Sequence, residues 1–296
     1  MPGTRRGTAS GKSATSSGSV RSKTRARQRI AAERAARNLA DARRRLLLSG
    51  AAVVAVVGVV GALVGVSLST AHPAARESRA TSFVVQQATS VPLGVLTRVS
   101  QGQAATPLQQ VAPSGPPLTV GGKPAVVFVS EESCPFCAAE RWSLVVALSH
   151  FGTWSNLGST RSSATDAYPN TASFSFRTAH YRSAKITLRT TELADNTGRA
   201  LQPETPLDAK LIGTYDVPPF VNSADQSGAV PFLDIANHYI LAGAQYNPQV
   251  LSGLSASQIA SQLRNPSSPV AQAIDGSARV IVAAIDQVLH APSLGA

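Results

Sequence analysis

The chain is poor in the residues on which several classes of protein function depend. Its 296 residues include two cysteines, five histidines and one methionine, and aromatic residues make up 5% of the total. Two cysteines cannot build a disulfide framework in a chain of this length. The histidines are scattered without metal-ligand spacing, and no segment resembles a phosphate-binding loop or a hydrolase triad. We therefore expect neither a metal nor a cofactor.

A net charge is also absent from most of the chain, although the formal total is +11. Residues 1–45 hold 13 Lys and Arg against two acids, whereas residues 46–296 hold 14 of each sign. An arm that is basic and poor in apolar residues is predicted to be largely disordered. We expect this arm to bind anionic lipid headgroups at a membrane surface, with no role in binding nucleic acid.

Residues 46–68 form a long apolar run without a charged side chain. As a helix, at about 1.5 Å per residue, they would span roughly 34 Å, which is enough to cross a bilayer. The basic arm before the run predicts a cytoplasmic N-terminus. A cleaved signal peptide has a shorter leader and a shorter apolar core. We therefore expect a single-pass anchor in the cell membrane, a tether over 69–90 and an extracytoplasmic domain over 91–296.

Both cysteines, Cys134 and Cys137, lie where a predicted strand gives way to a predicted helix. Residues 124–129 are β-branched or apolar, which indicates a buried strand, and residues 138–148 favour a helix. The start of a helix has unpaired N–H groups and about half a positive charge, which favours thiolate over thiol. Cys134 is therefore placed to act as a nucleophile. The nearby charged residues are interpreted as solvated: Glu131, Glu132, Glu140 and Arg141.

The rest of the chain mixes strand and helix patterns, which predicts an α/β fold. Strand predictions come from alternation of apolar and polar residues, and helix predictions from caps and apolar spacing. In chain order we expect strands at 171–177 and 184–190, a helix at 206–215 capped by Thr205, a hairpin from Phe232 to Leu241 turning at Asn237, and helices at 255–263 and 274–290.

A strand, a Cys-x-x-Cys at a helix start and Val230-Pro231 before a hairpin and a last helix together resemble the thioredoxin superfamily. Cys-Pro-Phe-Cys at 134–137 is similar to the motifs of glutaredoxins and periplasmic disulfide oxidases. The resemblance implies a thioredoxin-like three-layer fold over roughly 116–290, with a partly helical insertion between the Cys-x-x-Cys helix and the cis-Pro strand. The anchor followed by such a domain also resembles an uncharacterised family of extracytoplasmic bacterial and archaeal proteins.

The resemblance also implies roles for individual residues. Cys134 would attack a substrate and Cys137 would resolve the mixed disulfide. Pro135 and Phe136 would tune the pair and contact substrate, and Val230-Pro231, if cis, would present the Val230 backbone to an extended segment. The implied partners are extracytoplasmic protein thiols or disulfides, together with a redox partner in the membrane.

Three interpretations of the cysteine pair remain open: a redox-active centre, an inert structural disulfide, and half of a zinc site. The first makes the protein a membrane-anchored thiol-disulfide oxidoreductase of secreted or envelope proteins. The second makes it a binding or scaffold module of the cell envelope. Two departures from the thioredoxin pattern favour the module, namely Ser133 where a Trp is usual and Ala236-Asn237-His238 where the turn is usually glycine-rich.

Overall fold

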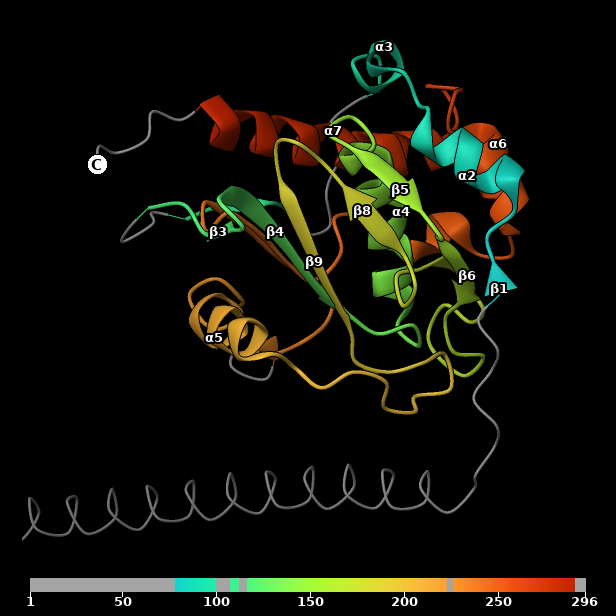
Figure 1. Cartoon of the computed structure of the whole chain (residues 1–296). Helices are drawn as coiled ribbons and strands as arrows, with labels where there is room; N and C mark the ends of the chain where they lie inside the picture. The colour runs from blue at the N-terminus through green and yellow to red at the C-terminus, as the bar shows by residue number, and fades with distance from the viewer. Residues whose placement is uncertain (1–77, 100–106, 112–115, 223–225, 291–296) are drawn as a thin grey trace, which may run out of the picture. The chain divides into compact units, whose positions relative to one another are not determined.

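The computed structural model describes residues 78–99, 107–111, 116–222 and 226–290, which all belong to one compact unit (Figure 1). The basic arm expected at 1–45 and the transmembrane helix expected at 46–68 lie outside the described residues. Within the described part, no helix has both the length and the apolar character needed to cross a bilayer.

A mixed sheet forms the centre of this unit. Its main strand, β4, pairs in parallel with β9 on one side and antiparallel with β10 on the other, and β10 continues into β11 as a hairpin. Two short strands, β2 and β3, pair with β11 and β4. The bounds are β2 Gln109–Gln110, β3 Thr119–Val120, β4 Lys123–Ser130, β9 Thr187–Glu192, β10 Phe232–Ile235 and β11 Tyr239–Ala242.

Different helices cover the two faces of this sheet (Figure 1). Because successive strand side chains point to opposite faces, Val126 and Phe128 pack on α4 and α7, whereas Val127 and Val129 pack on α5. These helices are α4 (Pro135–Leu148), α5 (Pro206–Tyr215) and α7 (Pro269–His290). The predicted α/β character is confirmed.

The local signals for helices are also confirmed. The Thr205 hydroxyl accepts a hydrogen bond from the backbone N–H of Asp208, whose carboxylate accepts the N–H of Thr205, so a capping box begins α5. Near the C-terminal end come a 3-10 turn η2 (Pro248–Leu251) and helix α6 (Ala256–Gln262) before α7. The hairpin turns at Ala236 and Asn237, both with positive φ, as expected for the position of Asn237.

The folded domain begins before residue 91, so the expectation that 69–90 is only a tether is wrong for its last part. Helix α2 (Ser82–Thr89) is capped by Thr81, and its Val84 and Ala88 are buried in the main core. These two residues are four apart and therefore share one helix face, which accounts for the packing. A short helix α3 (Leu93–Leu96) follows.

The interval between α4 and β9 contributes four strands, β5 to β8, to two small antiparallel sheets. One pairs β5 (Thr153–Ser155) with β8 (His180–Arg182), and the other joins β1 (Ser78–Arg79), β6 (Gly158–Arg161) and β7 (Ala172–Ser175). The interval between the two halves of the expected site was predicted to be partly helical. Helix α5 lies in this interval, but the residues between α4 and β9 are strands and turns.

Candidate functional site

The two cysteines occupy the first turn of α4, as the sequence predicts. Cys134 is the N-cap, and its Sγ accepts a hydrogen bond from the backbone N–H of Cys137 at 3.4 Å. Pro135 is the first helical residue. Its missing N–H costs nothing there, because that position has no acceptor within the helix.

The two thiols differ sharply in access. Cys134 is half-buried, whereas Cys137 is fully buried, and both are free. The Sγ of Cys137 accepts a hydrogen bond from the backbone N–H of Glu131 at 3.4 Å. Only Cys134 can therefore meet an atom of another molecule without rearrangement of the site.

The pKa values of the two thiols also differ, and the more accessible thiol has the lower value. A hydrogen bond from the Cys137 side chain lowers the pKa of Cys134 and outweighs burial, and backbone N–H groups of Cys137 and Phe136 lower it further. Burial, followed by the hydrogen bond with Cys134, raises the pKa of Cys137 well above its usual value. The accessible sulfur is thus the one that loses its proton first.

The segment just before β10, which is far from the cysteines in the sequence, completes the site. The Cys134 thiol donates to the carbonyl oxygen of Val230 across 3.7 Å, and the Val230-Pro231 peptide bond is cis. The structure therefore brings together Cys134, Cys137 and Val230-Pro231, as the sequence led us to expect. Phe136 is 38% exposed beside them.

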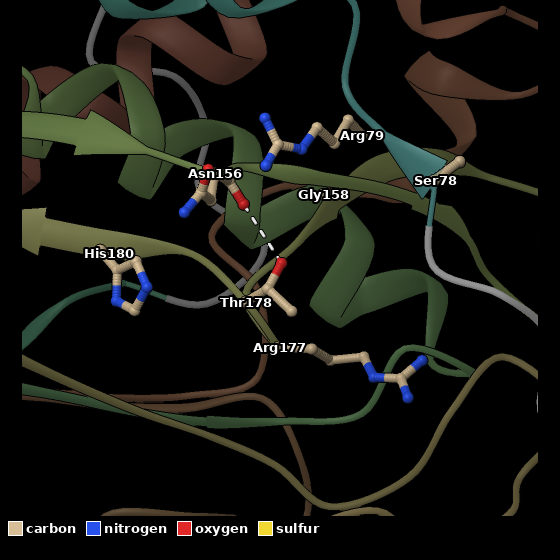
Figure 2. Close-up of a pocket in the computed structure, with 7 residues that line it drawn as sticks. All are labelled: Ser78, Arg79, Asn156, Gly158, Arg177, Thr178 and His180. Carbon is tan, nitrogen blue, oxygen red and sulfur yellow. Dashed lines mark hydrogen bonds between the residues drawn. The ribbon is translucent and has the colours of Figure 1, made fainter.

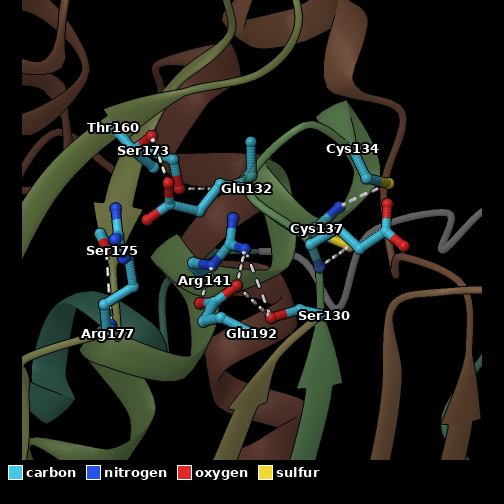
Figure 3. A network of polar contacts seen from close by, with 12 residues as sticks. Ser130, Glu132, Cys134, Cys137, Arg141, Thr160, Ser173, Ser175, Arg177 and Glu192 are labelled. Atoms are coloured by element: carbon cyan, nitrogen blue, oxygen red, sulfur yellow. Dashed lines mark hydrogen bonds and ion pairs between the residues drawn. The ribbon is translucent and has the colours of Figure 1, made fainter. Parts of the chain in front are cut away.

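The sequence-based interpretation of the neighbouring charges as solvated is wrong for three of the four. Glu132, Glu140 and Arg141 are buried, and only Glu131 is partly exposed. Figure 3 shows Arg141 directly against Glu192, with Cys137 on one side of it and Glu132 on the other. The charge of Arg141 favours the thiolate of Cys137, although burial dominates that pKa.

Arg141 is held by Glu192 at the end of β9. Its Nε and Nη2 donate to the two carboxylate oxygens at 2.9 and 2.5 Å, and Ser130 adds a hydrogen bond to the same carboxylate at 2.9 Å. Sequence reasoning missed this pair. The signal was present in α4, whose apolar residues surround the helix and so indicate burial of every side, including the side that carries Arg141.

Two further buried acids near the site form no ion pair among the residues that the structure describes. Burial raises the pKa of Glu132, which accepts a hydrogen bond from Thr160 at 3.3 Å. Burial also raises the pKa of Glu140 to about 7, and this carboxylate accepts the backbone N–H of Gln245 at 3.1 Å. Within the described residues, no group of three or more His, Cys, Asp or Glu is arranged to hold a metal ion.

The stretch from β2 into α7, which includes both halves of the site, matches one known family. The model of DUF929, a domain of unknown function, matches residues 109–287. The chain belongs to this family. Neither a curated protein nor a solved structure matches the chain. The expected membership of an uncharacterised family is thus confirmed, and Cys134, Cys137 and Val230 all lie within the DUF929 segment.

A separate hollow of about 510 Å³ lies away from the cysteines of the DUF929 domain. In Figure 2 the guanidinium groups of Arg79 and Arg177 point in different directions, so their charges do not converge on one position. The hollow is lined by Ser78, Arg79, Asn156, Gly158, Arg177, Thr178 and His180.

Proposed function

We propose that this DUF929 protein is a thiol-disulfide oxidoreductase in which Cys134 is the nucleophile and Cys137 the resolving residue. The observation that carries the proposal is the asymmetry of the pair. Cys134 is accessible, caps a helix and has a lowered pKa, whereas Cys137 is fully buried and has a raised pKa. A nucleophilic thiolate has to be both accessible and stabilised, and the half-buried Cys134 meets both conditions better than the fully buried Cys137.

The finer fold assignment, a thioredoxin-like domain, belongs to the same proposal. It is supported by the strand neighbours β9, β4, β10 and β11, of which the first pair is parallel and the others antiparallel. It is further supported by α4 and α7 on one face of the sheet and α5 on the other. On this assignment, β5 to β8 form the insertion.

The proposed reaction needs no cofactor. In the reducing direction the Cys134 thiolate attacks one sulfur of a substrate disulfide, and the other substrate sulfur leaves and takes a proton. Cys137 then loses its proton and attacks the Sγ of Cys134, which releases the second substrate thiol and leaves a Cys134–Cys137 disulfide. Two electrons pass from the pair to the substrate, and oxidation of a substrate dithiol is the exact reverse.

The cellular setting is proposed from the sequence. Residues 46–68 anchor the chain in the cell membrane, with the basic arm on cytoplasmic lipid headgroups and the DUF929 domain outside. The substrates are then thiols or disulfides of secreted or envelope proteins. A thiol or disulfide carrier at the membrane returns Cys134 and Cys137 to their starting oxidation state. A reporter fused after residue 296 should be active outside the cytoplasm; activity inside would reverse the topology.

The activity is tested with the full-length chain in detergent. We expect it to reduce insulin with a thiol donor or to oxidise reduced ribonuclease, and Cys134→Ser should abolish whichever activity is found. Activity that survives Cys134→Ser, or the absence of both activities in the parent, would contradict the proposal. The reduction potential of the pair then gives the direction, since about −120 mV marks a strong oxidant and about −270 mV a reductant.

A binding module with an inert disulfide is the second candidate. It is favoured by Ser133, which stands where thioredoxins usually have Trp and whose carbonyl oxygen accepts the backbone N–H of Ser163 in the β6–β7 connection. Trapping separates the two candidates, because Cys137→Ala should accumulate mixed disulfides with envelope proteins if the pair exchanges. An inert module yields none, and its partners are recovered without covalent bonds.

A further inference from the structure

The sheet formed by β1, β6 and β7 is fixed to the same helix that carries the cysteines. The Ser173 hydroxyl donates to the carbonyl oxygen of Ala138 at 2.8 Å, and the indole N–H of Trp142 donates to that of Ala172 at 2.9 Å. The rings of Trp142 and Phe174 lie 4.5 Å apart. These contacts join β7 to Ala138 and Trp142 of α4, the helix that carries the cysteines.

The connection between β6 and β7, residues 162–171, is held in one conformation by its own hydrogen bonds. Ser162 and Thr171 pair through their backbones at 2.9 Å. The hydroxyls of both residues also donate to the carbonyl oxygen of Tyr168, each at 2.9 Å. Asn170 has a φ of 56° and donates its N–H to the Ser163 carbonyl at 3.1 Å, which closes the turn. Tyr168 is therefore positioned before any partner binds.

This connection contacts the cysteine motif at two points. The backbone N–H of Ser163 donates to the carbonyl oxygen of Ser133 at 2.8 Å. The rings of Tyr168 and Phe136 meet edge to face, with their centroids 5.8 Å apart and their planes at 81°. The first contact fixes the residue before Cys134, and the second contacts the residue between the two cysteines.

The result is a partly exposed aromatic pair beside the nucleophile. Phe136 is 38% exposed, and Tyr168 is partly exposed. In the described part of the chain, the other large apolar side chains with high exposure are Phe83 on α2 and Leu93 on α3, away from the motif. The partly exposed Glu131 and the exposed Asp166 lie near this pair in sequence, whereas Arg141, whose charge acts on Cys134, is fully buried.

We propose that Phe136 and Tyr168 bind an apolar side chain next to the reacting cysteine of a polypeptide substrate, which makes Tyr168 a specificity-determining residue. The inference rests on the proposed exchange activity. A substrate sulfur bonded to Cys134 lies about 2 Å from its Sγ, and one extended residue spans about 3.5 Å, so the flanking side chain is within reach of the aromatic pair. Cysteines of unfolded chains, which have apolar residues beside them, fit this site; oxidised glutathione, which has no apolar side chain beside its cysteine, does not.

Two uncharged peptides test the proposal, one with Phe and one with Ser beside its cysteine, each in disulfide linkage to 2-mercaptoethanol. The pre-reduced full-length chain is mixed with each peptide in a single turnover, and the second-order rate constants are compared. We expect the Phe peptide to react about tenfold faster, as one aromatic contact allows. Bis(2-hydroxyethyl) disulfide, which has no flanking side chain, serves as the reference substrate.

Variants in the β6–β7 connection test whether Tyr168 causes the preference for the Phe peptide. Tyr168→Ala should bring the two peptides within about twofold of each other, and a cooperative urea unfolding transition of the variant shows that the domain is folded. Tyr168→Phe should keep the preference, and Thr165→Ala, an exposed position on the same connection, is the matched control. Equal rates for both peptides in the parent, or a preference that persists in Tyr168→Ala, would overturn the inference alone. Failure of the parent to react even with the reference disulfide would overturn the proposed function together with it.

Discussion

Arg141 and Glu192 form a buried ion pair in which two N–H groups of the guanidinium meet both carboxylate oxygens, one of them at 2.5 Å. The side chains are 0% and 1% exposed. The pair joins the cysteine helix α4 to β9, the parallel neighbour of β4. It therefore ties together the two elements between which β5, β6, β7 and β8 lie in the chain.

Glu192→Gln should destabilise the domain strongly, because it leaves the guanidinium of Arg141 buried without its counter-charge. Removing one partner of a buried pair costs about 3–5 kcal/mol. Urea unfolding of parent and variant measures the difference. The double variant Arg141→Met with Glu192→Leu should cost less than Glu192→Gln alone, and a larger loss in the double variant would show that the pair itself stabilises the fold.

Cys137→Ala should raise the pKa of Cys134, because the hydrogen bond from the Cys137 side chain is the largest cause of its depression. The rate of iodoacetamide alkylation of Cys134, followed between pH 5 and 10, gives the midpoint in parent and variant. In the parent we expect Cys134 to be alkylated before the buried Cys137. A midpoint that stays the same in Cys137→Ala, or moves to lower pH, would contradict this account.

Stability should fall as pH rises from about 4 to about 8, because Asp275 titrates in that window. Burial raises its pKa from 3.8 to about 8, and within the described residues neither carboxylate oxygen has a hydrogen-bond partner. The folded state therefore holds a proton that the unfolded state has released, and the stabilisation present below pH 4 is lost up to pH 8.

Asp275→Asn tests this dependence, since Asn has nearly the same shape and does not titrate. A single group changes the free energy of unfolding by at most about 1.4 kcal/mol per pH unit. The variant should show a shallower decline than the parent in urea unfolding at pH 5, 6, 7 and 8. Parallel curves for the two proteins would rule out Asp275 as the source.

Gly152→Ala should destabilise the domain by about 1–3 kcal/mol, the usual cost of overpacking. A Cβ at this position would lie 2.3 Å from the carbonyl oxygen of Arg182 and 2.7 Å from the ring of Tyr181, and the backbone atom cannot move aside cheaply. Gly213→Ala is the matched control. It lies in α5 with nothing within 4 Å, and there Ala should stabilise by about 0.5–1 kcal/mol. Thermal unfolding of both variants gives the comparison.

Local patterns in the sequence predicted the parts of the fold that depend on neighbours in the chain. The apolar run became β4, the predicted helix at 206–215 is α5 with Thr205 as its cap, and the hairpin turns at Asn237. The predicted strands at 171–177 and 184–190 appear as β7 and, shifted towards the C-terminus, as β9. Each of these elements has a periodicity or a capping residue that can be recognised within its own segment of the sequence.

What sequence reasoning missed depends on distant partners. Strand β1 is two residues long and exists because Ser78 and Arg79 pair with Ser159 and Gly158, which no local pattern reveals. The contact between Tyr168 and Phe136 likewise joins segments that only the fold brings together. The cysteine pair and Val230-Pro231 could be predicted, because a family resemblance supplied the long-range relationship that composition cannot.

The short strand β1 has a mechanical consequence. It is the point at which the described chain enters the domain, and its two residues pair side by side with β6. A pull on the chain before Ser78 therefore acts first on these two pairs, and β6 leads directly into the connection that holds Tyr168.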